Sequence, residues 1–165
     1  MDQRVKRPNR LVQSLLWALW IALITAQTAL SFFLYDPAGI QALWWLAWRV
    51  WLATCVFAWL PVVILRRRGG VPRGRSFVHT TLLVDSGIHG VVRHPQYLSF
   101  ILLSLFVILM AQHCLITVMG IAAAATVYAG IVPQEDLCNI EKFGDSYRRC
   151  MRRVPWLNAL VLWDS

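Results

Sequence analysis

Four apolar stretches divide this 165-residue chain, and nearly all of its charged residues lie in short blocks between them. The stretches cover approximately residues 11–35, 40–65, 95–111 and 114–133. A helix of about 20 apolar residues is long enough to cross the hydrocarbon core of a bilayer. The pattern therefore predicts an all-α integral membrane protein, a single domain over 1–165 with about four transmembrane helices.

The composition excludes several other classes of protein. Charged residues make up only 15% of the chain and apolar residues 58%, whereas a soluble domain usually carries about a quarter charged residues. A formal net charge of +8 could indicate a nucleic-acid partner, but blocks of charge between apolar runs favour membrane lipids as the partner. The four cysteines form no C-x-x-C pair, so we expect neither a metal site nor a disulfide framework.

The distribution of basic residues predicts how the chain is oriented. With four spans, the N-terminus, the loop over 66–96 and the tail from residue 134 share one side and hold fifteen of the sixteen Lys and Arg residues. The positive-inside rule places both termini in the cytoplasm. The loop over 66–96 would then cover a site from the cytosol, and the short apolar segment at 156–163 would lie at the interface. The shortness of the chain favours a prokaryotic cell membrane.

Two polar clusters should meet at the cytosolic face. One runs from Arg93 to Tyr97, at the entry to the third span, and the other is Glu135-Asp136, after the fourth. The two spans form a hairpin, so its start and its end lie at the same depth. A helix that begins at Pro95 points its positive end toward this region and favours an anionic group, while the two acids favour a cation. A ligand with both charges, such as S-adenosylmethionine, would fit. Alternatively, the clusters are interfacial anchors and solvated charges of the tail.

The order of these residues also carries a motif. Gly87-Ile88-His89 and Arg93-His94-Pro95-x-Tyr97 are followed by Glu135-Asp136, Phe143-Gly144-x-x-Tyr147 and Val154-Pro155. This pattern, over residues 82–157, resembles the isoprenylcysteine carboxyl methyltransferase family, which is akin to the membrane phospholipid methyltransferases. The sequence departs from it at His89, where Tyr or Phe is usual, at Ser99 for Gly, at Asp136 for Glu and at Cys150 for Tyr.

The resemblance implies an integral-membrane methyltransferase with S-adenosylmethionine as its cofactor. The residues that it implies for cofactor binding are Gly87, Arg93, His94, Pro95, Tyr97, Glu135 and Asp136. Glu135 would also accept a proton if the methyl acceptor is an amine, and Arg152 would hold a substrate carboxylate. A lipophilic or lipid substrate would enter sideways from the bilayer.

Three functions are compatible with the sequence. The first is an isoprenylcysteine carboxyl methyltransferase-like enzyme that acts on a lipophilic small molecule. The second is a phospholipid N-methyltransferase of the phosphatidylethanolamine type. The third is a non-catalytic four-helix membrane protein. Arg49, the one charge within a predicted span, either reaches the far interface or faces the bundle.

Overall fold

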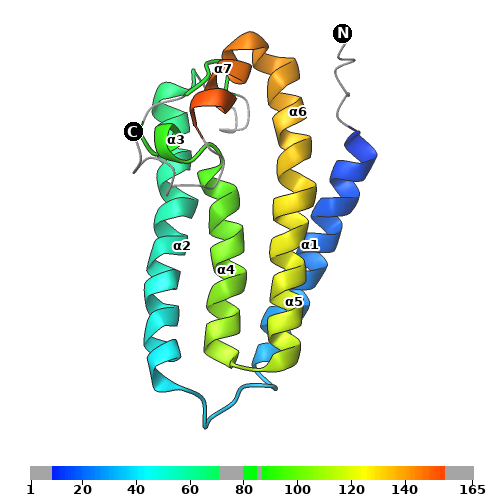
Figure 1. Ribbon diagram of the computed structural model, residues 1–165, viewed down its shortest axis with the longest axis vertical. Coiled ribbons are helices and arrows are strands. Elements are labelled where there is room, and N and C mark those ends of the chain that lie inside the picture. The colour runs from blue at the N-terminus through cyan, green and yellow to red at the C-terminus, as the bar shows by residue number, and fades with distance from the viewer. Residues whose placement is uncertain (1–8, 71–79, 85–86, 155–165) are drawn as a thin grey trace.

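The apolar stretches of the sequence form long helices that lie side by side in an elongated bundle (Figure 1). The computed structural model describes residues 9–70, 80–84 and 87–154, and all regular structure within these ranges is helical. In chain order the elements are α1 (Arg10–Ser31), α2 (Gln41–Arg68), α3 (Ile88–Val91), α4 (Pro95–Ala111), α5 (Cys114–Ala125), η2 (Thr126–Ile131), α6 (Val132–Phe143) and α7 (Asp145–Arg153).

Among the described residues, three helical segments have the length and composition needed to cross a membrane. They are α1, α2 and the continuous helix Cys114–Phe143, while α4 is a shorter apolar helix of 17 residues. The predicted all-α membrane fold is therefore confirmed. The predicted interfacial segment at 156–163 lies outside the described residues, as does part of the predicted loop over 66–96.

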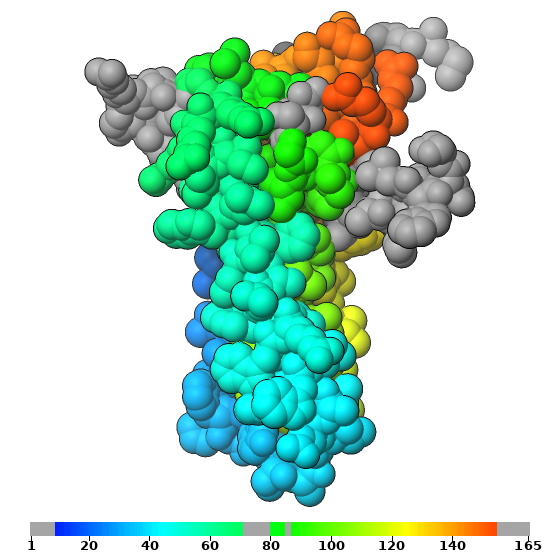
Figure 2. All heavy atoms as spheres, turned by 90° about the vertical axis from the view of Figure 1, so that its left-hand side faces the viewer, coloured from blue at the N-terminus to red at the C-terminus, as the bar shows by residue number. Residues whose placement is uncertain are grey.

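The helices alternate in direction, so both ends of the described chain come to the same end of the bundle (Figure 1). α2 packs mainly against α4, and α1 packs against α5 and η2. α3 and α7 lie at the end where α2 stops and α4 starts, and Figure 2 shows α7 in orange and red at that end. The polar residues that precede α4 and the polar residues of α6 and α7 therefore lie at the same end of the bundle.

The fourth span continues past its predicted end at residue 133. The helix runs on through Pro133 to Phe143, and the turn before the proline is a π-helix. Pro133 has no N–H to donate to the preceding turn and its ring crowds that turn. A π-turn widens the helix locally, with the N–H of Val132 bonded to the carbonyl of Val127. As a result, Glu135 and Asp136 lie on a rigid helix that leads out of the bundle.

A polar clamp joins the loops at the opposite end. Gln112, in the left-handed region at φ +50°, ends α4 and allows the tight turn into α5. Its side-chain oxygen accepts from the N–H of Ile40 at 2.7 Å and its nitrogen donates to the carbonyl of Ile40 at 3.0 Å. The clamp fixes how the α1–α2 pair sits on the α4–α5 hairpin.

One fully buried polar side chain ties the first helix to the hairpin. Gln27 of α1 is 0% exposed, and its amide nitrogen donates to the carbonyls of Ser104 at 3.1 Å and Ile116 at 3.4 Å. Gly120 of α5 leaves the room for this side chain, because a Cβ there would lie 2.4 Å from the amide nitrogen.

Arg49 of α2, the charged residue within a predicted span, is exposed and so does not face the bundle.

Candidate functional site

The segment that enters α4 is folded by glycine and proline. Gly87 precedes α3 with φ +65°, a conformation that favours glycine. After the single turn of α3, Val92 is extended, His94 caps α4 and Pro95 occupies its first turn, where the missing N–H of proline costs nothing. This geometry turns the side chains of Arg93 and His94 toward α6 and α7.

Asp136 of α6 is the centre of a hydrogen-bonded cluster. Its Oδ2 lies 3.1 Å from Nη2 of Arg93, and its Oδ1 lies 2.8 Å from Nε2 of His94. The hydroxyl of Tyr147 donates to the same Oδ1 at 2.5 Å. The predicted meeting of the two clusters is thus observed, and the carboxylate of Asp136 has a positive partner in Arg93 and a phenol donor in Tyr147.

Arg93 extends this cluster to the end of α7. Its Nη1 donates to the carbonyls of Met151 and Val154, each at 3.3 Å. These carbonyls have no partner within α7 because they lie at its C-terminal end, where a positive charge is also favourable. The side chain of Arg93 is 8% exposed. One guanidinium therefore fixes the start of α4, the outer part of α6 and the end of α7.

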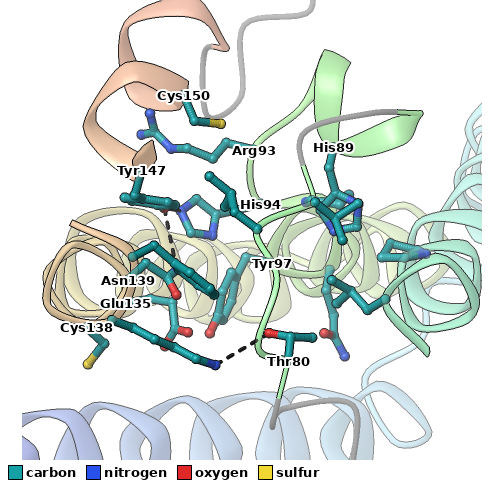
Figure 3. A pocket seen from close by; sticks show the side chains of 18 of the residues that line it. Thr80, His89, Arg93, His94, Tyr97, Glu135, Cys138, Asn139, Tyr147 and Cys150 are labelled. Atoms are coloured by element: carbon teal, nitrogen blue, oxygen red, sulfur yellow. Dashed lines mark hydrogen bonds between the residues drawn. The ribbon is translucent and has the colours of Figure 1, made fainter. Parts of the chain in front are cut away.

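Tyr147 is the contribution of α7 to the cluster. The side chain is 3% exposed, and Figure 3 shows it between His94 and Asn139, whose amide nitrogen lies 3.5 Å from the hydroxyl. Burial, together with the hydrogen bond to Asp136 and the charge of that carboxylate, raises the pKa of Tyr147. The phenol therefore stays protonated and acts as a donor.

A cavity of about 560 Å³ opens beside the cluster. Residues at helical spacing on α6 form one wall: Glu135, Cys138, Asn139 and Lys142. The Nζ of Lys142 lies 3.4 Å from the hydroxyl of Thr80, which also lines the cavity. α1 contributes Gln13 and Trp17, and α2 contributes Pro61 and Leu65, so part of the wall consists of membrane-length helices.

The two neighbouring acids of α6 have different surroundings. Asp136 is paired with Arg93 and is not among the lining residues, whereas Glu135 lines the cavity. The amide nitrogen of Gln13 donates to Oε2 of Glu135 at 3.4 Å, and the hydroxyl of Tyr97 points toward the same carboxylate (Figure 3). Within the described part of the chain Glu135 forms no salt bridge. Its charge is therefore available to a ligand.

His89 lines another side of the cavity. The residue is 9% exposed, and its Nδ1 has no hydrogen-bond partner among the described residues. Burial, and then the charge of His94, lowers the pKa of His89 to about 4. At neutral pH the ring is therefore neutral, with polar atoms that the surrounding residues do not satisfy.

The residues predicted from the motifs fall into two groups. The residues that line the cavity are Arg93, His94, Pro95, Tyr97 and Glu135. Gly87 provides the positive φ before α3. Asp136 does not line the cavity, but it is bonded to Arg93 and His94, which do. Arg152 is exposed on α7 and is not among the lining residues, so the structure does not bring it to the others.

Among the residues of the site that sequence reasoning did not assign are Gln13, Trp17, Asn139 and Tyr147. Tyr147 stands in the motif and could have been included. Asn139 lies one helical turn beyond Glu135, on the same face, and this spacing could also have identified it. Gln13 and Trp17 carry no signal beyond a polar and an aromatic residue near the end of an apolar helix.

The comparisons with known proteins concern this part of the chain. The sequence pattern of the isoprenylcysteine carboxyl methyltransferase (ICMT) family matches residues 75–138. A protein-S-isoprenylcysteine O-methyltransferase of Schizosaccharomyces pombe is 28% identical over 99 residues, which cover 55% of this chain and 42% of the relative. The chain thus spans less than half the length of that relative, and no solved structure matches it. The match includes Arg93, His94, Glu135 and Asp136. The resemblance predicted from the motifs is therefore confirmed: residues 75–138 of this chain carry the pattern of the ICMT family.

Proposed function

We propose that this protein is an integral-membrane methyltransferase that uses S-adenosylmethionine and methylates a lipophilic acceptor, as an ICMT-like enzyme would. The proposal rests on the different surroundings of the two neighbouring acids, Glu135 and Asp136. Asp136 is neutralised by Arg93, while Glu135 lines a cavity without a charged partner among the described residues. A half-buried carboxylate with only neutral donors favours a cationic ligand.

The residues present fit this cofactor. A cavity of about 560 Å³ is within the range of about 300 to 1,000 Å³ that is usual for ligands of this size. With Arg93 and His94 already paired with Asp136, it is the positive end of α4 that favours an anionic group such as a carboxylate. Glu135 favours a cation, and the Nδ1 of His89 and the Nε of Arg93 are buried polar atoms without a partner among the described residues.

The cofactor supplies an activated methyl group on a positively charged sulfur. The task of the protein is therefore to hold the two reactants in line and to exclude water. His94 and Arg93 are held in fixed positions by Asp136, and Tyr97 and Trp17 provide an apolar wall. A carboxylate acceptor needs no base, whereas an amine acceptor must lose a proton, and Glu135 is the carboxylate in the cavity that could take it.

The test is transfer of a labelled methyl group by the purified protein. The acceptors are a prenylcysteine analogue, vesicles that contain phosphatidylethanolamine, and a lipid extract. We expect methyl esters on the prenylcysteine analogue. Labelled headgroups would instead favour the phospholipid N-methyltransferase, and no transfer together with no cofactor binding would favour a non-catalytic protein.

The variant Glu135→Gln tests whether the charge of Glu135 contributes to cofactor binding. It preserves shape and removes the charge, so we expect the affinity for S-adenosylmethionine, measured by calorimetry in detergent, to fall by about tenfold or more. Asp145→Asn is the matched control, because Asp145 is an exposed acid of α7 that does not line the cavity. Equal affinities in the wild type and Glu135→Gln would remove Glu135 from the site.

A further inference from the structure

Two aromatic rings from different helices form one wall of the cavity. The ring centroids of Trp17 on α1 and Tyr97 on α4 are 6.0 Å apart, with their planes at 40°, and both residues line the cavity. Phe100 and Trp20 hold the Trp17 ring by edge-on contacts at 5.8 and 5.7 Å, but neither of them lines the cavity. Trp17 is therefore a fixed aromatic surface at the edge of the site.

The free carboxylate lies beside this wall. Gln13 and Trp17 are one turn apart on α1, and Gln13 donates to Oε2 of Glu135 at 3.4 Å. The ring of Tyr97 contacts Trp17, and its hydroxyl points toward Glu135 (Figure 3). α1 thus brings an aromatic ring and a positioning amide to the carboxylate of α6.

This combination selects a particular kind of ligand group. The faces of aromatic rings carry negative charge density and attract cations, and the attraction is strongest for Trp. Sulfonium and alkylated ammonium groups are weakly hydrated cations with apolar surfaces, so they gain from an aromatic wall and from a nearby carboxylate. A neutral sulfide of the same shape gains only the apolar contact.

We propose that Trp17 is a binding residue for the sulfonium centre of the methyl donor, in a cation site that Tyr97 and Glu135 complete. This inference rests on the proposed function and deepens it, because it assigns a role to a helix outside the segment that matches the ICMT family. In this site the positively charged donor is held in preference to the neutral sulfide that remains after the methyl group has left.

The experiment compares three ligands by calorimetry on the full-length protein in detergent. S-adenosylmethionine carries a sulfonium, sinefungin carries an amine at the corresponding position, and S-adenosylhomocysteine carries a neutral sulfide. The variants are Trp17→Leu, the conservative Trp17→Phe, and Trp51→Leu as the matched control, because Trp51 of α2 packs against Phe106, makes no ring contact with Trp17 and does not line the cavity. Circular dichroism establishes that each variant is folded.

We expect Trp17→Leu to weaken the two cationic ligands by about 5- to 30-fold, which corresponds to a cation–π interaction of about 1 to 2 kcal/mol. S-adenosylhomocysteine should change by less than about threefold, and Trp17→Phe should restore part of the preference for the cations. Trp51→Leu should leave the ratio of affinities unchanged. Equal losses for all three ligands, or no loss, would overturn the role of Trp17 while leaving the proposed function intact. If the wild type binds none of the three, the proposed function itself fails.

Discussion

The Nη2 atom of Arg93 lies 3.1 Å from Oδ2 of Asp136, a residue 43 positions further along the chain. The pair connects the segment before α4 to the outer part of α6, and both side chains are largely buried, at 8% and 15% exposure. Removing one member of a buried ion pair leaves the other charge without compensation. The pair should therefore determine whether the end of the bundle that carries α3 and α7 keeps its shape.

The variant Asp136→Asn should lower the free energy of unfolding by about 2 to 4 kcal/mol, because Arg93 loses its charged partner. The measurement is unfolding in detergent, followed by circular dichroism. Asp145→Asn is the control, since Asp145 pairs with Arg148 at 3.6 Å while 81% exposed, and exposed pairs contribute at most about 1 kcal/mol. Equal effects of the two substitutions would show that the buried cluster does not stabilise the fold.

The sequence predicted the helical class and the meeting of the two polar clusters, because both depend on patterns that burial in lipid imposes. Apolar runs of the length of a membrane predict spans, and a hairpin of two spans brings its ends together. The exact helix ends were harder to predict. Pro133 normally disrupts a helix interior, and whether a π-turn accommodates it depends on packing in three dimensions.

The different roles of Glu135 and Asp136 could not be read from the sequence. Neighbouring residues on an α-helix point about 100° apart, but the sequence does not tell which of the two directions leads into the cavity. The same reason explains why Gln13 and Trp17 were missed. Their role depends on how α1 rotates against α4 and α6, and an apolar helix in lipid carries little signal for its own orientation.

Protonation of His89 should make stability depend on pH. The pKa of His89 is about 4 in the folded protein and about 6.5 in an unfolded chain. Between these values the unfolded chain binds the proton and the folded protein does not, so stability is lost as the pH falls from about 6.5 to about 4. The loss amounts to at most about 1.4 kcal/mol for each pH unit.

The variant His89→Phe isolates this contribution, because it introduces an aromatic residue of the kind usual at this position of the motif and removes the titrating group. We expect the melting temperature of the variant to decline less steeply than that of the wild type between pH 6.5 and pH 4. Carboxylates titrate in the same range, so the difference between the two curves is the relevant quantity. Parallel curves would mean that His89 accepts a proton in the folded state as easily as in the unfolded one.

The orientation in the membrane is tested by cysteine labelling. Ala38 lies in the loop between α1 and α2, and Ser146 is exposed on α7 at the opposite end of the bundle (Figure 1). In a background without the four native cysteines, Ala38→Cys and Ser146→Cys should react with an impermeant reagent from opposite sides. The positive-inside rule predicts that position 146 faces the cytoplasm. Labelling of both positions from one side would contradict a membrane-spanning bundle.

The acceptor should reach the site from the bilayer. Trp17, Pro61 and Leu65 line the cavity and belong to α1 and α2, two helices with the length and composition of membrane spans. A lipophilic acceptor is concentrated in the membrane, and each buried CH₂ contributes about 0.8 kcal/mol. We therefore expect kcat/KM to rise steeply with alkyl or prenyl chain length among acceptors that share one headgroup.

The assay keeps detergent concentration fixed, so that differences in partition do not dominate the comparison. Because a gain of about 0.8 kcal/mol corresponds to roughly a fourfold change in an equilibrium constant, four additional methylene groups should raise kcat/KM by well over tenfold until the chain exceeds the apolar wall. The rise in kcat/KM should come mainly from a fall in KM, since contacts with the chain are the same in the ground state and the transition state. A flat or falling series would contradict entry from the bilayer and would favour a small polar acceptor, such as a simple thiol, that reaches the cavity from the cytosolic side.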